Sequence, residues 1–446
     1  MTPAAANDPG GPTISIEEME DAVLSGDRAI TTGTARAALR HRTFRIVYLG
    51  AFASNIGTWM QNVVLGAYAY DLTHSSTFVG VMIFAQLGPI LLLAMLGGLI
   101  ADRVNRKKFL MILSIEQLVF SFALAWVVRA HSPSLVLLTL MVVLVGAGGA
   151  MFGPAYSAVL PMMVGKEDMP GAISLNSAQM NLSRVIGPPI GAVAYHFVGP
   201  SWVFGGNAVT YLFVVIALMM VTLPPITRRA DEATSNFRQL IAGISVARAD
   251  KVVGRCLVTV FVFSLLALAF LGQMPVVAAH NLGIQPNSAN YGILYGCFGT
   301  GAFLGAISIG TVFARTSKPL IVRVCLLGYT LTLIGFALLR AALPAYFVVA
   351  ILGAFYFAFI TALNTTMQTR LENAVRGRVM ALWIMGFGGT VALGNLLAGP
   401  IVSTVGITDV LLFGAGVALL LAWYADVRAP VDQVVLGSPI GEIELT

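Results

Sequence analysis

Two ionisable side chains lie deep inside apolar stretches of the sequence, and they are the first candidates for chemistry. Glu116 and Arg184 each sit in a run that we expect to cross a membrane as a helix. A charge at the centre of a bilayer costs about 2.5–3.5 kcal/mol even on lenient scales, so each of these residues needs a reason to be there. A carboxyl group in such surroundings can bind and release protons near neutral pH. Glu116 is therefore a candidate for proton coupling, with a structural pair on its own helix or snorkelling towards the headgroups as the alternatives.

Arg184 lies about twelve residues, or ~18 Å of helix, into its apolar run. Three roles are open to it: binding an anionic group of a substrate, pairing with Glu116, or a structural tie to backbone carbonyls near a helix kink. A third candidate for proton coupling, Asp71, falls at the outer end of the first apolar run, where a solvated helix terminus is the simpler explanation.

The elements that hold these residues are membrane-spanning helices. The chain has 446 residues, of which 57% are hydrophobic and 10% charged, which is too apolar and charge-poor for a soluble globular protein. Many apolar segments exceed 18 residues, and such segments cross lipid as helices, because every backbone group must be satisfied internally. The twelve predicted spans are roughly 44–70, 77–100, 107–130, 134–160, 171–198, 202–223, 252–282, 289–313, 319–340, 343–368, 377–404 and 407–427.

The positive charges give the orientation of these spans. All of the 26 Lys and Arg residues except Arg129, Arg184 and Arg340 fall on one side of the membrane if the spans alternate in direction. Short cytoplasmic loops are enriched in Lys and Arg, so this side is the cytoplasmic one and both termini lie there. The basic pI of about 9.3 therefore reflects membrane topology and excludes nucleic-acid binding as its explanation.

The domain organisation is two groups of six helices. We expect a flexible cytoplasmic tail at 1–43, an N-terminal six-helix bundle at 44–223, a cytoplasmic linker with an amphipathic helix at 224–251, a C-terminal six-helix bundle at 252–427, and a cytoplasmic tail at 428–446. The fold class is thus an all-α membrane protein with two pseudo-symmetric halves in the inner (cell) membrane.

Motifs for enzyme chemistry and for cofactors are absent from the sequence. Cys256, Cys297 and Cys325 have no metal-binding spacing, and no Gly-x4-Gly-Lys-Ser/Thr phosphate loop occurs, so we expect no metal, no cofactor and no ATP hydrolysis by that route. An ion or solute gradient must then supply the energy, and one charge crossing the membrane potential is worth ~2.3 kcal/mol per 100 mV.

A basic hinge joins the second and third predicted spans. Its spacing is Gly98-x-x-x-Asp102-Arg103-x-x-Arg106-Lys107, and it resembles the signature at this place in the major facilitator superfamily of secondary transporters. Asn105 stands at the second glycine position, where a residue that readily adopts left-handed backbone is expected. The resemblance implies a cytoplasmic gate in which Asp102 docks at the start of span eleven, beside Arg376 and Arg378, with Gly98, Arg103, Asn105 and Arg106 shaping the turn.

Two glycine–proline segments predict helix hinges. Gly187, Pro188 and Gly191 lie in span five, where proline removes a backbone donor and glycine lets a neighbouring helix approach closely. A kinked packing face is the alternative. Gly399 and Pro400 are the plausible counterparts in span eleven. The core of the span-five segment is similar to the antiporter signature of superfamily exporters, which implies export rather than uptake.

Further motifs narrow the resemblance to one family of exporters. Leu72-Thr73-x-Ser75, Asn181-x-Ser183-Arg184-x-x-Gly187-Pro188, Phe204-x-x-Asn207-Ala208 and Arg376-Gly377-Arg378-Val379-Met380 are similar to the drug:proton antiporter family that includes the enterobactin exporter and macrolide efflux proteins. The chain departs from common patterns at Val142, where many superfamily members carry Arg, and after Gly57, where some relatives carry an acid.

The resemblance also implies a central substrate cavity lined by spans one, four, seven and ten. Asn55, Thr58 and Asn62 recur at helical spacing and give span one a polar stripe. Amides with aromatics suit an amphipathic organic solute better than a bare ion or a sugar. The predicted cavity residues are Asn55, Thr58, Gln61, Asn62, Arg184, Gln273, Phe355, Tyr356, Phe359 and Asn364.

The sequence therefore predicts a monomeric secondary transporter and not an enzyme. It would export an amphipathic small molecule, such as a drug, siderophore or metabolite, by alternating access in exchange for protons. A lipid or lysolipid transporter of the same fold is one alternative, and a non-transporting membrane sensor or scaffold is another.

Overall fold

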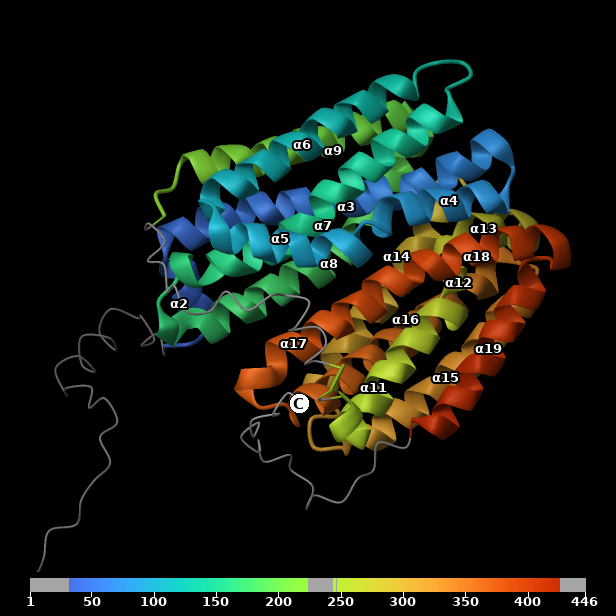
Figure 1. Cartoon of the computed structure of the whole chain (residues 1–446). Coiled ribbons are helices and arrows are strands. Elements are labelled where there is room, and N and C mark those ends of the chain that lie inside the picture. Colours follow the sequence, from blue (N-terminus) through green and yellow to red (C-terminus); the bar gives the residue numbers. More distant parts are fainter. Residues whose placement is uncertain (1–31, 224–243, 246, 426–446) are drawn as a thin grey trace, which may run out of the picture.

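The computed structural model describes residues 32–223, 244–245 and 247–425, and these contain helices and turns without a strand (Figure 1). The predicted C-terminal tail and residues 1–31 of the predicted N-terminal tail lie outside these ranges, whereas residues 32–43 of that tail are described and largely helical. The predicted amphipathic helix of the linker falls largely outside them. The side chains of Asp102, Asn373 and Ala374 also lie outside the described part.

The N-terminal half consists of a short helix followed by long ones. These helices are α2 (Ala35–Arg40), α3 (Arg42–Thr73), α4 (Ser76–Leu87), α5 (Ile90–Arg103), α6 (Arg106–Val127), α7 (Leu135–Met163), η1 (Lys166–Asp168), α8 (Met169–Val198) and α9 (Pro200–Met219). Side-chain caps explain several starts: Ser75, Asn105 and Ser134 each accept a hydrogen bond from the backbone amide three residues on. The predicted second span is divided into α4 and α5 at Gly88-Pro89, since proline cannot continue the helical hydrogen bonding.

The C-terminal half contains helices of similar length, two of them interrupted by π-helical turns. Its elements are α11 (Lys251–Val262), η2 (Phe263–Ala267), α12 (Ala269–Gly272), α13 (Met274–Leu282), α14 (Ala289–Gly310), α15 (Lys318–Leu338), α16 (Ala342–Gln368), α17 (Asn373–Ile384), η3 (Met385–Gly389), α18 (Thr390–Val405) and α19 (Ile407–Tyr424). The predicted seventh and eleventh spans are thus broken at η2 and η3. Such breaks are common at functional sites.

Nine helical stretches of the described part are long and apolar enough to cross a membrane. They correspond to predicted spans two, three, four, six, eight, nine, ten, eleven and twelve. The other three predicted spans coincide with α3, with α8 and with the broken run from α11 to α13.

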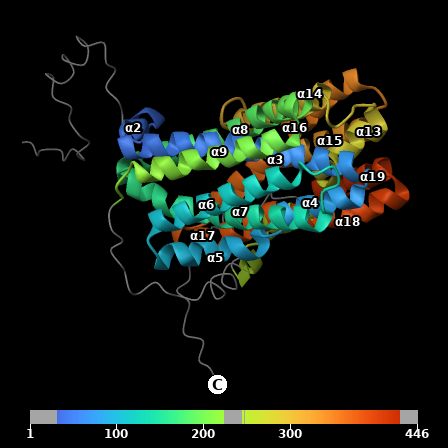
Figure 2. The same ribbon diagram turned by 90° about the horizontal axis from the view of Figure 1, so that it is seen from above.

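The two halves lie side by side and contact each other along two pairs of helices. Figures 1 and 2 show α4 beside α18 and α8 beside α14, and in each pair one helix comes from each half. Glycine permits both contacts. A Cβ atom on Gly80 of α4 would collide with the carbonyl oxygen of Asn395 on α18, and one on Gly299 of α14 would lie 3.0 Å from the carbonyl oxygen of Arg184 on α8. Without a hydrophobic driving force between helices in lipid, such close backbone approach is what holds them together.

Hydrogen bonds between the halves gather at one end of the molecule, which we call the α13 end. The Tyr70 hydroxyl and His280 Nε2 are 2.8 Å apart, Ser76 Oγ donates to the carbonyl oxygen of Gly399 over 2.8 Å, and Gln273 Nε2 donates to that of Ser76 over 3.2 Å. These bonds join α3 and α4 to the C-terminal half. The α13 end is therefore closed in this conformation.

At the opposite end, the α2 end, Asp168 ties the start of the described chain to α8. One carboxylate oxygen accepts from the Gly33 amide over 3.0 Å, and the other lies 2.8 Å from His41 Nε2. These partners hold the pKa of the Asp168 carboxyl below its ordinary value. The contact is therefore fully present above that ordinary value and is lost only as the pH falls through the lowered one.

The glycine contact between α4 and α18 gives the first prediction. Replacing Gly80 with Val should lower the free energy of unfolding by about 1–3 kcal/mol, because the new side chain must push α18 away. Gly416→Val on α19 is the matched control, since nothing lies within 4 Å of its Cβ position. Thermal unfolding of the purified protein measures both, and equal unfolding midpoints for the two variants would contradict the prediction.

Candidate functional site

A half-buried cation lies between the two halves. The guanidinium carbon of Arg184 on α8 is 5.3 Å from the ring centre of Trp59 on α3 and 5.3 Å from that of Phe357 on α16. Its Nη1 donates to Asn181 Oδ1 over 3.5 Å, and its Nε is buried without a hydrogen-bond partner. One aromatic ring thus comes from each half, and the cation between them is incompletely satisfied.

The predicted hinge of span five places Arg184 there. A Cβ atom on Gly187 would lie 2.6 Å from Cβ of Trp59, and one on Gly191 would lie 2.8 Å from Cα of Met60, so α8 packs directly on α3 at these glycines. Pro188 is buried at the same contact. The next residue, Pro189, faces the other half, where a Cβ atom on Gly296 of α14 would be 3.0 Å from its ring. The hinge segment therefore contacts both halves.

The predicted hinge of span eleven also lies at a contact between the halves. A Cβ atom on Gly399 would be 2.8 Å from the carbonyl oxygen of Ser76, and Pro400 follows inside α18. Both glycine–proline segments thus lie where one half meets the other. Their bending during a functional cycle stays a prediction.

Glu116 on α6 faces α7 instead of Arg184. A Cβ atom on Gly148 of α7 would collide with its Oε2, and this oxygen is buried with no hydrogen-bond partner in the described structure. No salt bridge joins Glu116 to Arg184, although the structure describes both side chains. The two ionisable groups therefore occupy separate sites, one within the N-terminal half and one between the halves.

A buried polar network crosses the N-terminal half. Gln61 Oε1 accepts from Asn207 Nδ2 over 2.9 Å and from Ser121 Oγ over 3.4 Å, which joins α3 to α9 and α6. The hydroxyls of Thr58 and Tyr211 are 3.3 Å apart, and Tyr211 also accepts from Asn207 over 3.3 Å. Asn207 belongs to the family motif Phe204-x-x-Asn207-Ala208, and its place in this network was not predicted from the sequence. The signal that could have identified its role is an amide inside an apolar run, which needs a partner in lipid.

Four predicted cavity residues are packed inside the protein in this conformation. Gln61, Gln273, Tyr356 and Phe359 are at most 2% exposed, so they do not line a cavity here. Gln61 belongs to the network above, and Gln273 bonds to Ser76 at the contact between the halves. Tyr356 and Phe359 pack against Phe263 in the C-terminal half.

The other predicted cavity residues are half-buried. Asn62 accepts a hydrogen bond from Gln86, Asn364 accepts one from Gln368, and the ring of Phe355 fills the space beside Gly328. Asn55 lies on α3 one turn before Trp59, on the helix that also carries Thr58. Of all the predicted cavity residues, Arg184 alone has aromatic partners in both halves.

Asp71 lies near the closed α13 end. Its Oδ2 accepts a hydrogen bond from the Tyr195 hydroxyl over 2.7 Å, which joins the end of α3 to that of α8. The neighbouring Tyr70 contacts His280 of the other half. Asp71 is therefore a bonded group beside a contact between the halves and not a free helix terminus.

The predicted gate lies at the α2 end, where the side chain of Asp102 is outside the described part. Arg106 Nη1 donates to the carbonyl oxygen of Ala158 over 2.9 Å, which ties the hinge to α7. The glycine-like position of Asn105 suggested a left-handed backbone, but its φ is −62°. Asn105 instead caps α6, where its Oδ1 accepts a hydrogen bond from the Lys108 amide. Arg376 Nη2 donates to the carbonyl oxygen of Leu371 over 3.2 Å. The remaining gate residues are Gly98, Arg103 and Arg378, of which Arg103 is exposed.

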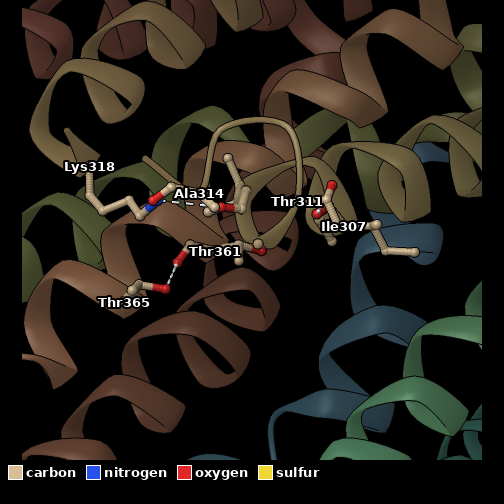
Figure 3. A pocket seen from close by; sticks show the side chains of 9 residues that line it. Ile307, Thr311, Ala314, Lys318, Thr361 and Thr365 are labelled. Atoms are coloured by element: carbon tan, nitrogen blue, oxygen red, sulfur yellow. Dashed lines mark hydrogen bonds between the residues drawn. The ribbon is translucent and has the colours of Figure 1, made fainter. Parts of the chain in front are cut away.

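A pocket of about 480 Å³, not predicted from the sequence, lies between the ends of α14 and α16 (Figure 3). Its lining is mostly apolar, with hydroxyls from Thr311, Thr361 and Thr365. Lys318 points to the end of α14, and its Nζ donates to the carbonyl oxygens of Phe313 and Ala314 over 2.8 and 3.0 Å. The ammonium group of Lys318 is thus hydrogen-bonded to the backbone at the end of α14. The sequence signal that could have indicated this pocket is the pair of threonines four residues apart on α16, Thr361 and Thr365.

Among the described residues, no group of three or more His, Cys, Asp or Glu side chains could hold a metal ion. Arg184 with its two aromatic rings offers a ligand both hydrogen-bond donors and apolar ring surface.

Comparison with known proteins places the chain among membrane transporters. Residues 33–435 match the family described as transmembrane secretion effector. The chain is 26% identical over 355 residues to the enterobactin exporter EntS of Shigella boydii serotype 4 (strain Sb227), covering 77% of this chain and 81% of the relative. Identity to EntS of Escherichia coli O1:K1 / APEC is also 26%, over 354 residues, with the same shares covered.

Two solved structures share the fold. A mutant of the nucleoside transporter NupG superposes with a TM-score of 0.71 at 13% identity, over 86% of this chain and 99% of that one. A bacterial homologue of the human lysosomal transporter Spinster, in an inward-facing and occupied conformation, gives a TM-score of 0.66 at 15% identity, over 86% and 96%. These likenesses concern the helical arrangement alone.

The buried network gives the second prediction. Replacing Gln61 with Met keeps the volume but removes the oxygen that accepts from Asn207 and Ser121, so unfolding should become easier by about 1 kcal/mol. Gln285→Met, at an exposed position between α13 and α14, is the control. The two thermal unfolding midpoints are compared, and a Gln61 variant as stable as the control would show that the network contributes nothing.

Proposed function

This chain belongs to the transmembrane secretion effector family and is a major facilitator superfamily transporter that exports small molecules, and we propose that it does so by alternating access, in exchange for protons. The proposed cargo is amphipathic. The protein is a multi-pass protein of the inner (cell) membrane.

The closed α13 end supports alternating access. The halves are joined there by hydrogen bonds between uncharged partners or backbone, such as Ser76 to Gly399, and by glycine-lined helix contacts. None of these contacts requires a charge pair to be broken, so opening this end while closing the other is energetically feasible. We propose that the α13 end faces the outside and the α2 end the cytoplasm, with twelve spans, both termini cytoplasmic and a monomer as the working unit.

The place of Arg184 supports cargo binding between the halves. Its guanidinium touches rings from α3 and α16, so a molecule bound there contacts both halves and is exposed to whichever side is open. A membrane sensor or scaffold has no need for an unsatisfied cation at this place. The pocket beside Thr361 lies at the cytoplasmic end on this topology, where arriving cargo would first meet the protein.

Glu116 is the proposed proton-coupling residue. Its Oε2 is buried without a partner, so a proton on this oxygen would remove an uncompensated charge. The network of Gln61, Asn207 and Tyr211 lies in the same half and connects α6 with α3 and α9. Asp71 and Arg184 are the other groups that could take part.

A transport assay tests the function and the role of Glu116 together. In proteoliposomes, an imposed proton gradient should drive the accumulation of amphipathic dyes by the wild type. Glu116→Gln should reduce this driven uptake at least tenfold while downhill exchange persists, since the cargo site is unchanged. Glu167→Gln in the exposed η1 turn is the control and should behave as the wild type. Unchanged pH dependence in Glu116→Gln would eliminate it as the coupling acid, and absence of any dye transport would contradict the function.

The predicted cytoplasmic gate is tested at Asp102. Asp102→Asn should lower turnover at least tenfold without loss of membrane insertion, because the acid would no longer dock at the positive start of α17 near Arg376. Asp409→Asn, in the first turn of α19, changes an acid at a helix end away from this gate and should leave transport intact. Initial rates of dye transport at equal protein density provide the measurement. A fully active Asp102→Asn variant would contradict the proposed gate.

A further inference from the structure

Arg184 is a charged group without a counter-ion. Among the described residues no carboxylate forms a salt bridge with its guanidinium, and its only hydrogen bond is a long one, 3.5 Å, to the neutral oxygen of Asn181. Its Nε is buried and makes no hydrogen bond. A buried guanidinium normally uses its donors in pairs on a carboxylate or phosphate. Arg184 is therefore arranged as the cation of an ion pair whose anion is not supplied by the described residues.

The two aromatic rings restrict where the missing partner can approach. Trp59 and Phe357 each have the guanidinium carbon over the ring at 5.3 Å. Contacts of this kind use the faces of the guanidinium and leave the N–H donors at its edge for hydrogen bonds. A ligand that reaches this edge meets the remaining surface of the two rings, from α3 and α16, since one face of each ring already contacts the guanidinium. Such surroundings favour a flat apolar body attached to the negative group.

Among the residues whose side chains the structure describes, no acid takes this place. Glu116, which the sequence left open as a partner, faces Gly148 of α7 within the N-terminal half. Asp71 is bonded to Tyr195 near the α13 end. The described acids therefore leave the counter-charge to be supplied by a molecule that enters between the halves.

We infer that the cargo is an amphipathic organic anion whose carboxylate, phosphate or sulfonate group binds the free edge of Arg184 while its planar apolar part lies against Trp59 and Phe357. This deepens the function proposed above and rests on it. The anionic group can belong to a free metabolite or to a single-chain phospholipid, because both supply the same oxygen acceptors.

The charge of the cargo changes the energetics of export. An anion that leaves the cell moves down the electrical gradient of an inside-negative membrane, and 100 mV sustains about a 50-fold concentration ratio for one charge. Proton entry in exchange adds a second favourable charge movement. In one-for-one exchange with a proton, export of an anion moves two charges down the membrane potential, whereas export of a neutral cargo moves the charge of the proton alone and is coupled half as strongly to that potential.

Binding by the full-length purified protein tests the site first. The probes are 2-naphthoate and 2-naphthamide, which share a ring system and differ in charge. Naphthoate should raise the thermal unfolding midpoint in a saturable way, and naphthamide should bind at least tenfold more weakly. Arg184→Gln should abolish this difference, and Arg184→Lys should keep part of it. Arg129→Gln is the control, since Arg129 covers Trp126 outside this site.

Transport tests the energetics. Proteoliposomes receive a potassium diffusion potential with no pH difference, and the flux of naphthoate, naphthamide and lysophosphatidylglycerol is followed. Naphthoate flux should follow the sign of the potential and exceed naphthamide flux at least tenfold, because the neutral probe binds more weakly, although its exchange for a proton also moves one charge. Movement of lysophosphatidylglycerol, with naphthoate left behind, would assign the anionic group to a lipid.

The outcomes separate the inference from the function. Equal affinity for naphthoate and naphthamide in the wild type would overturn the inference, and this comparison needs no variant. Naphthoate selectivity that survives in a folded Arg184→Gln protein would overturn it too. If neutral dyes are exported but neither naphthoate nor lysophosphatidylglycerol is, the proposed function stands and the inference about an anionic cargo fails. If no probe moves under any gradient, the function itself fails.

Discussion

Close approach of helix backbones between the two halves is the constraint on which the rest of this structure depends. Lipid offers no hydrophobic force to press apolar helices together, so packing of small residues and a few polar bonds must hold them. Gly80 and Gly399 supply this packing between α4 and α18, and Gly292 and Gly299 supply it between α8 and α14. Contacts of this type are tight but easily separated, because they contain no buried ion pair. They fit a protein whose halves move against each other.

Polar residues are divided between two tasks by this arrangement. Those within the N-terminal half, such as Gln61 and Asn207, satisfy one another and fix α3, α6 and α9 together. Between the halves, Ser76 and Gln273 are hydrogen-bonded at the α13 end, whereas Arg184 is left incomplete. The network within the N-terminal half helps that half to rotate as a unit, while the unsatisfied guanidinium at its surface is available to a ligand. The division explains why Thr58 need not serve the cargo although it shares a predicted polar stripe with Asn55 and Asn62, and why the nearby Gln61 need not serve it either.

The sequence predicted the helical spans, the glycine–proline segments and the two deep ionisable residues, because each depends on local composition. It could not predict the partners of Arg184, since Trp59 and Phe357 are brought together only by packing of the two halves. The sequence also predicted Gln273 and Tyr356 as cavity residues. A polar or aromatic residue in an apolar run gives the same sequence pattern whether its side chain faces a cavity or packs inside its own half. The breaks at η2 and η3 have no sequence signal as plain as the proline after Gly88.

The segment of α8 from Arg184 to Gly191 connects cargo recognition to the contact between the halves. Gly187 and Gly191 fix this segment against α3, and Pro189 lies against Gly296 of α14. Arg184, one turn before Gly187, reaches Phe357 of α16. When the α8–α14 contact shifts, the guanidinium must change its distance from Phe357, because its own helix is fixed to α3. A group that binds the guanidinium therefore experiences the relative position of the halves directly, and its binding free energy differs between conformations. This difference is what lets a ligand shift the equilibrium between them.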